Sequence, residues 1–159
     1  MSLAAVAPSA VSHAASTLQI LTFVVNGDEY GVDILSVQEI RGWAQPMPIP
    51  NAPPSVRGVI NIRGEIVPIV DLRSILGLPE RRPDETTVVV VLRDHNTPPR
   101  VLGTIVDAMA DVMDITREAI KPLPTFETTG VTVGVVTLPE KMISLLNPNA
   151  LLPPRKASV

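Results

Sequence analysis

The sequence predicts a mainly β protein, made of two small antiparallel β units with a few short helices. Its 17 prolines and 9 glycines divide the chain into about ten short apolar runs. These runs are rich in Val and Ile, which favour strands over long helices. A charged segment at residues 80–85 interrupts the pattern near the middle of the chain. The spacing fits either one sandwich or two small barrels, and the charged interruption favours two barrels.

The first half of the chain is expected to contain two hairpins. Its elements, in order, are strands at 18–26 and 29–34, a short helix at 34–40, a proline-rich surface loop at 45–54, and strands at 57–62 and 65–70. Asn26-Gly27 in the first hairpin and Arg63-Gly64 in the second favour tight turns, because glycine readily adopts positive φ.

Several single residues predict where the short elements begin and end. Ser36 and Glu39 have the spacing of a capping box, which indicates the first short helix. Asp71 and Thr116 are each expected to cap a further short helix that follows them. Pro68 cannot donate a backbone hydrogen bond, so it is expected at a sheet edge or in a bulge.

The second half of the chain is expected to add strands at 86–93, 100–107 and 110–115 and a last hairpin of 131–138 and 141–146. The boundary between the two units is expected near residues 79–85. Residues 18–152 then form the folded part. Residues 1–17 are expected to be a disordered tail rather than a targeting peptide, because they lack a basic start and a continuous apolar stretch. Residues 153–159 are expected to be a flexible tail.

Composition excludes several classes of function. Aromatic residues make up 3% of the chain and the net charge is -3, which argues against binding to nucleic acid. The chain has no cysteine, so it has no disulfide, thiolate metal site or cysteine nucleophile. The longest apolar run, Val88 to Leu92, is far shorter than a membrane span of about 18 residues. We therefore expect no direct insertion into a membrane.

Few residues are candidates for catalysis or for metal binding. His95 lies in the polar segment DHNTPP with no nucleophile motif beside it, and we expect an exposed loop residue. Asp107, Asp111 and Asp114 form a carboxylate cluster, but on a strand Asp114 faces away from the other two. We therefore expect a solvated acidic face rather than a Mg²⁺ or Ca²⁺ site. No cofactor and no enzymatic activity are expected.

Two residues have two interpretations each. Trp43 precedes the proline-rich loop, where it is either a packing anchor or an exposed aromatic side chain of an interface. Arg63 has no obvious acidic partner nearby in the sequence. A solvated arginine is its simpler interpretation, and a contact residue for a partner is the alternative.

Four segments together resemble the CheW family of chemotaxis coupling proteins. They are VDILSVQEIRGW at 32–43, GVINIRGEIVPIVDLR at 58–73, VVVVLR at 88–93 and LGTIVDAMADVMDI at 102–115. The resemblance extends in consistent order over residues 18–151, and the segment at 58–73 is the most specific. It implies a fold of two intertwined five-stranded SH3-like β-barrel subdomains.

The resemblance also implies a function. Proteins of this family are non-catalytic adaptors that connect the cytoplasmic tips of methyl-accepting chemoreceptors to the regulatory domain of the histidine kinase CheA. We therefore expect a cytoplasmic protein associated with receptor arrays. The alternative is an adaptor of a chemosensory system that controls an output other than flagellar motility.

Two partner surfaces follow when the family's contact positions are carried over by motif. The receptor-facing groove is expected to comprise Ile34, Val37, Glu39, Arg63, Thr87 and Val88. The kinase-facing surface is expected to comprise Gly58, Gly103, Met109 and Val112. A groove with an apolar floor and a charged rim suits an amphipathic helical partner. Gly103 is expected either to let a partner backbone approach closely or to mark a bulge in its strand.

Overall fold

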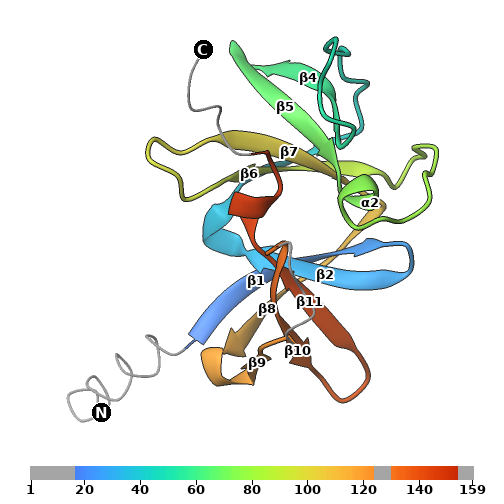
Figure 1. The fold of residues 1–159 in the computed structure, drawn as a ribbon. Helices are drawn as coiled ribbons and strands as arrows, with labels where there is room; N and C mark the ends of the chain where they lie inside the picture. Colours follow the sequence, from blue (N-terminus) through green and yellow to red (C-terminus); the bar gives the residue numbers. More distant parts are fainter. Residues whose placement is uncertain (1–16, 124–129, 154–159) are drawn as a thin grey trace.

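The computed structural model describes residues 17–123 and 130–153, which form two stacked β units (Figure 1). The two expected tails, 1–17 and 153–159, lie outside the described part except for Thr17 and Pro153. Thr17 begins the first strand. Among the described helices, none has the length and apolarity to cross a membrane. The mainly β fold class is confirmed, because strands in two sheets make up most of the described residues.

The lower unit of Figure 1 is a six-stranded sheet with the order β8-β1-β2-β11-β10-β9. Its strands are β1 (Thr17–Val25), β2 (Asp28–Asp33), β8 (Ala108–Thr116), β9 (Ile120–Lys121), β10 (Thr132–Thr137) and β11 (Met142–Leu146). All neighbours pair antiparallel except β2 and β11, which are parallel. The expected first and last hairpins are confirmed.

The upper unit is a five-stranded sheet with the order β3-β6-β7-β5-β4. Its strands are β3 (Val37–Gly42), β4 (Val56–Ile62), β5 (Glu65–Asp71), β6 (Val88–Arg93) and β7 (Val101–Val106), and the short helix α2 (Leu72–Ile75) follows β5. The second hairpin is confirmed, and its turn residue Arg63 has φ 52°. Asp71 caps α2 as expected, because its side chain accepts from the Arg73 N–H at 3.0 Å.

The chain does not pass from one sheet to the other near 79–85, where the charged segment predicted a boundary. That segment connects α2 to β6, and β5 and β6 belong to the same sheet. The crossings lie between β2 and β3 and between β7 and β8, so residues 37–106 form one unit inserted into the other. The charged residues make a surface connection within one unit. This arrangement is the intertwining that the family resemblance implies.

The helix expected at 34–40 is wrong. A single 3-10 turn, η1 (Ile34–Ser36), is followed at once by β3, because residues 37–42 pair with β6 from Val37 opposite Leu92 to Gly42 opposite Val88. Long-range pairing thus overrides a weak local helix signal. The cap expected at Thr116 is also wrong. Its side chain makes no cap hydrogen bond to η2 (Arg117–Ala119).

Pro68 lies neither on an edge strand nor at a bulge. Its strand β5 is flanked by β4 and β7, but the pairing with β7 covers only Ile69 to Asp71. Pro68 therefore occupies the part of β5 that pairs with β4 alone, opposite Val59. A missing backbone donor is tolerated there because no second strand needs it.

Both faces of the central strands are buried, which explains their continuous apolar runs. In β6, Val89 and Val91 pack in the core of the upper unit, whereas Val90 and Leu92 pack in the cluster between the two units. In β1, Phe23 belongs to that same central cluster. The central cluster joins the two units and fixes their relative placement.

The upper unit is closed by the segment that follows β3. Met47 and Val59 exchange two backbone hydrogen bonds of 2.8 and 2.9 Å, which joins this segment to the edge strand β4. Gly58 makes the contact possible, since a Cβ built on it would lie 2.2 Å from the Met47 carbonyl oxygen. The five-stranded sheet therefore closes into a small barrel.

Candidate functional site

An ion-pair network joins β3 to the β4–β5 turn of the upper barrel. Glu39 in β3 accepts from Arg41 at 2.9 Å and from Arg63 at 2.5 Å. Arg63 stands at the β4–β5 turn with 72% of its side chain exposed, whereas Glu39 is 21% exposed. The hydrogen bonds from Arg41 and then Arg63 lower the pKa of Glu39. Arg63 is thus not simply solvated, because the tertiary fold supplies an acid that lies 24 residues away.

Apolar side chains lie on the other face of β3 from Glu39, where η1 and β3 meet the central cluster. Ile34, Val37 and Val88 are half-buried and pack against that cluster. Leu35 and Ile40 were not predicted from the sequence, yet they are 85% and 45% exposed. Four of the expected receptor-facing residues, Ile34, Val37, Glu39 and Val88, therefore lie on η1, on β3 or on the strand paired with it, and Arg63 joins them through Glu39.

Thr87 has a different environment from the rest of the expected receptor-facing set. Its side chain is buried, with the residue 6% exposed. Its hydroxyl oxygen accepts from the Asp84 N–H at 2.9 Å. Thr87 therefore holds the turn that precedes β6.

The four residues of the expected kinase-facing set lie in two separate places. Met109 and Val112 are on β8, an edge strand of the lower unit, and Val112 is 45% exposed. Gly58 and Gly103 are buried in the upper barrel. A Cβ on Gly103 would lie 2.7 Å from both Ile69 and Val89. The close approach that Gly103 allows is therefore made by side chains of this chain, and its strand runs through without a bulge.

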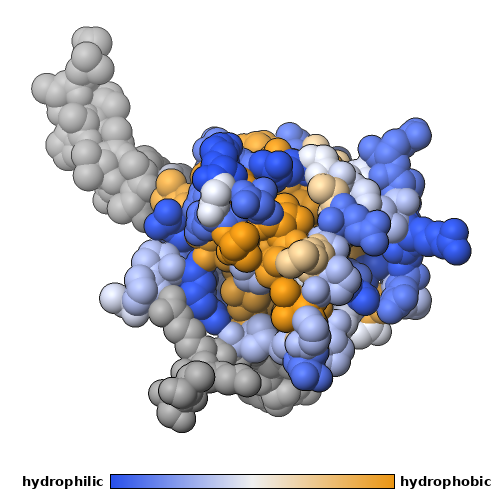
Figure 2. All heavy atoms as spheres, turned by 90° about the horizontal axis from the view of Figure 1, so that it is seen from above, coloured by the Kyte–Doolittle hydropathy of each residue, from blue (hydrophilic) through white to orange (hydrophobic). Residues whose placement is uncertain are grey.

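A further apolar surface was not anticipated from the sequence. Figure 2 shows apolar side chains gathered on the face seen from above, over the end of the molecule that β4 and β5 occupy in Figure 1. The exposed apolar residues of β5 and the proline-rich loop are Ile66 (60%), Met47 (62%) and Ile49 (40%). Gly58 supports this face, because it lets Met47 lie across β4.

The expected acidic face is wrong for Asp107. Its carboxylate is 11% exposed and pairs with Arg73 through bonds of 2.7 and 3.1 Å. The same carboxylate also pairs with Nη1 of Arg81 at 3.1 Å and accepts from the backbone N–H of Asn26 at 2.8 Å. Burial alone raises the pKa of Asp107, but the hydrogen bonds from Arg73 and Asn26 outweigh it and lower that pKa.

This cluster connects the two units. Arg73 belongs to α2 of the upper unit, Asn26 to the β1–β2 turn of the lower unit, and Asp107 to the crossing between β7 and β8. Asp111 and Asp114 remain exposed on β8, as expected. No group of three potential ligands that could hold a metal ion occurs in residues 17–123 and 130–153.

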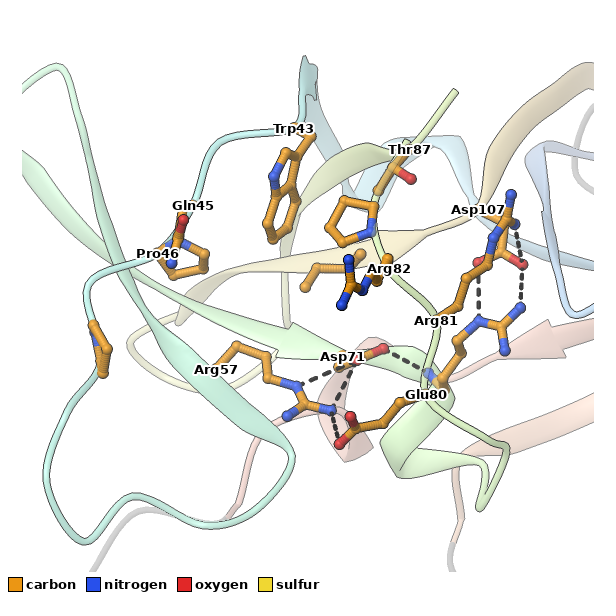
Figure 3. Close-up of a pocket in the computed structure, with 14 residues that line it drawn as sticks. Trp43, Gln45, Pro46, Arg57, Asp71, Glu80, Arg81, Arg82, Thr87 and Asp107 are labelled. Atoms are coloured by element: carbon orange, nitrogen blue, oxygen red, sulfur yellow. Dashed lines mark hydrogen bonds and ion pairs between the residues drawn. The ribbon is translucent and has the colours of Figure 1, made fainter. Parts of the chain in front are cut away.

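Trp43 fits its packing interpretation. It is half-buried and packs against the core of the upper barrel. It also forms one wall of a cavity, together with the proline-rich loop and residues 80–83 (Figure 3). His95 is exposed in the β6–β7 loop, as expected.

Comparisons with known proteins agree with the fold. The model of the CheW-like domain family matches residues 19–155. Chemotaxis protein CheW of Klebsiella aerogenes is 44% identical over 137 residues, covering 84% of this chain and 81% of that protein. Chemotaxis protein CheW of Rhizobium meliloti is 34% identical over 138 residues, covering 85% and 87%. The crystal structure of the scaffolding protein TtCheW from Thermoanaerobacter tengcongensis matches with a TM-score of 0.75 at 29% identity, covering 82% of this chain and 88% of that chain.

Proposed function

The chain belongs to the CheW-like domain family, and on this basis we propose that it is a non-catalytic adaptor that couples methyl-accepting chemoreceptors to the histidine kinase CheA. Relatives that bear the name chemotaxis protein and a structural relative described as a scaffolding protein support this role. The relatives' names favour chemotaxis over another output. We place the adaptor in the cytoplasm, where the receptor tips and the kinase lie.

The observation that carries the proposal is that β3 holds Glu39, paired with an exposed Arg63, on one face and, together with η1, exposes apolar side chains on the other. An amphipathic helical receptor tip would lay its apolar face against this surface. Leu35 and Ile40 are exposed in the free protein, so burying them would favour binding. Of the guanidinium nitrogens of Arg63, only Nη2 donates to Glu39. The other guanidinium donors of Arg63 therefore have room for a partner oxygen.

We assign the receptor contact to Ile34, Val37, Glu39, Arg63 and Val88. Thr87 positions this surface by holding the turn before β6. For the kinase contact we assign Met109 and the exposed Val112 on the edge strand β8. The buried Gly58 and Gly103 act through the shape of the upper barrel, since neither presents a surface to a partner.

The test replaces Arg63 with alanine. An exposed ion pair adds at most about 1 kcal/mol to stability, so Arg63→Ala should fold and melt almost as the wild type does. Its affinity for a receptor fragment should fall by about 1–3 kcal/mol, which is the cost of removing an interface anchor. Arg63→Lys should also bind more weakly, because lysine lacks the planar fork.

Lys121→Ala is the matched control, because Lys121 is an exposed cation on β9 of the other unit. It should leave receptor binding and kinase activation unchanged. Binding would be measured by calorimetry, and kinase activation in a reconstituted complex of receptor fragment, kinase and adaptor. If Arg63→Ala folds and activates the kinase as well as Lys121→Ala does, Arg63 is not a receptor contact.

A further inference from the structure

A cavity of about 400 Å³ lies beside the upper barrel (Figure 3). Trp43 and the prolines of the 45–48 loop form one wall, and residues 80–83 of the charged segment form another. Its volume falls in the range of small-molecule sites. Apart from the turn residue Thr87, no residue assigned to the receptor or kinase contact lines it, so its occupant is a question separate from the adaptor role.

Most of the charged residues that line the cavity are paired, and Arg81 is also paired with Asp84, which lies outside the lining. Four arginines and three carboxylates line it: Arg57, Arg73, Arg81 and Arg82 against Asp71, Glu80 and Asp107. Each carboxylate is paired with an arginine other than Arg82. Arg82 has no ion pair with any described residue. In Figure 3 its side chain lies in the cavity between Trp43 and Arg57, and no interaction is drawn to it.

Arg57 offers a second attachment point for an anion. Its strong partner is Asp71, at 3.0 Å from Nη2. Its second partner, Glu80, is 3.4 Å away with 82% of the side chain exposed. A surface pair of this length is weak. A ligand anion can therefore replace Glu80 at Arg57 without disturbing the pair with Asp71.

The opposite wall is mostly apolar, with Gln45 as its one polar side chain among the lining residues. The indole of Trp43 lies along it, with Pro46 and Pro48 nearby, and Ile105 of β7 also lines the cavity. Trp43 packs against the barrel core, which makes the wall rigid. A flat apolar ligand body can stack there.

We propose that this cavity binds a small organic monoanion, with a carboxylate held by Arg82 and Arg57 and an aromatic body against Trp43. One negative charge on the ligand would pair with Arg82, the lining arginine that has no ion pair with any described residue. The two arginine forks suit the planar geometry of a carboxylate. Benzoate is the simplest probe with both features.

Trp43 is the only tryptophan of the chain, so its fluorescence reports directly on the cavity. Benzoate should change that fluorescence saturably, with a Kd on the order of 1 mM for so small a ligand. Benzamide has the same shape as benzoate but no charge. Acetate has the carboxylate but no aromatic body, and inorganic phosphate is an anion that also has no aromatic body. All three should bind at least about tenfold more weakly. Binding of benzamide, acetate or phosphate as tight as that of benzoate would overturn the proposal.

Two variants test the named residues. Arg82→Gln should weaken benzoate binding about tenfold, whereas Arg93→Gln, an exposed arginine at the end of β6, should leave it unchanged. Glu80→Gln should tighten binding, because it removes the internal competitor at Arg57. Thermal melts of each variant would check that it folds. The proposal requires both weaker benzoate binding in Arg82→Gln and tighter benzoate binding in Glu80→Gln. Absence of either result refutes it. The adaptor role is tested by receptor binding and not by benzoate binding, so failure of this proposal can be distinguished from failure of the adaptor role.

Discussion

The ion pair of Arg73 with Asp107 offers the sharpest test of how the two units are held together. Asp107→Ala removes an acceptor that serves Arg73, Arg81 and the Asn26 backbone at once. Arg73 is 8% exposed, and in the variant its remaining acceptor among the described residues is the Pro79 carbonyl at 2.7 Å. The change therefore leaves a nearly buried cation without an ion-pair partner, with only the weaker attraction of the Asp71 carboxylate.

The expected cost follows from that environment. Removing one partner of a buried ion pair costs about 3–5 kcal/mol. The partly exposed Arg81 adds little, because water solvates it in the variant. For a chain of this length, such a loss lowers the melting temperature by roughly 10 °C. Asp114→Ala, on an exposed carboxylate of β8, should cost less than about 0.5 kcal/mol.

Urea unfolding followed by Trp43 fluorescence and by far-UV circular dichroism gives the free energies. The double variant Arg73→Met/Asp107→Leu should be more stable than Asp107→Ala, because it leaves no unpaired buried charge. If Asp107→Ala costs no more than Asp114→Ala, the pair does not hold the units together. A double variant that is less stable than Asp107→Ala would refute the explanation from an unpaired charge.

Two further predictions concern other buried positions. Hydrogen bonds from Arg100 and Asn96 outweigh the opposing effect of burial and lower the pKa of Asp94 to about 2. A depressed pKa adds stability that is present above the ordinary value of 3.8 and is lost as pH falls to 2. Between pH 5 and pH 2 the wild type should therefore lose about 2 kcal/mol more unfolding free energy than Asp94→Asn, and equal losses in urea titrations would contradict this. Gly58→Ala should cost about 2 kcal/mol or more, since Gly58 has φ 144° and lies against Met47. Gly42→Ala is its control, because Gly42 has open space around it. If the two variants melt at the same temperature, the close contact between Gly58 and Met47 is disproved.

Local sequence accounted for most of the strands and turns. Alternating or continuous runs of β-branched residues predicted the strands, and Asn26-Gly27 and Arg63-Gly64 predicted two of the hairpin turns. These signals work because a tight turn and the strands beside it depend on neighbouring residues. The local signal after Asp33 was misleading, because it predicted a helix at 34–40. Its capping-box spacing is a real signal, but pairing with β6 is stronger.

The candidate surface was predictable only in part. Motif positions identified Glu39 and Arg63, but neither residue indicated the other as its partner. Leu35 and Ile40 could not be recognised as exposed, because exposure of an apolar side chain depends on which strands cover it. The cavity beside Trp43 draws its walls from β4, β5, α2, β7, the segment after β3 and the segment at 80–83, a combination that no local pattern contains.

The sequence by itself determined the mainly β class, the hairpins, the cap at Asp71 and the resemblance to one family. Tertiary structure decided where the chain crosses between the units and which charges meet. Asp107 shows why: its partners Asn26 and Arg73 are 81 and 34 residues away. Turns and caps are set by neighbours in the chain, whereas an ion pair forms only after long-range strand pairing has brought distant residues together.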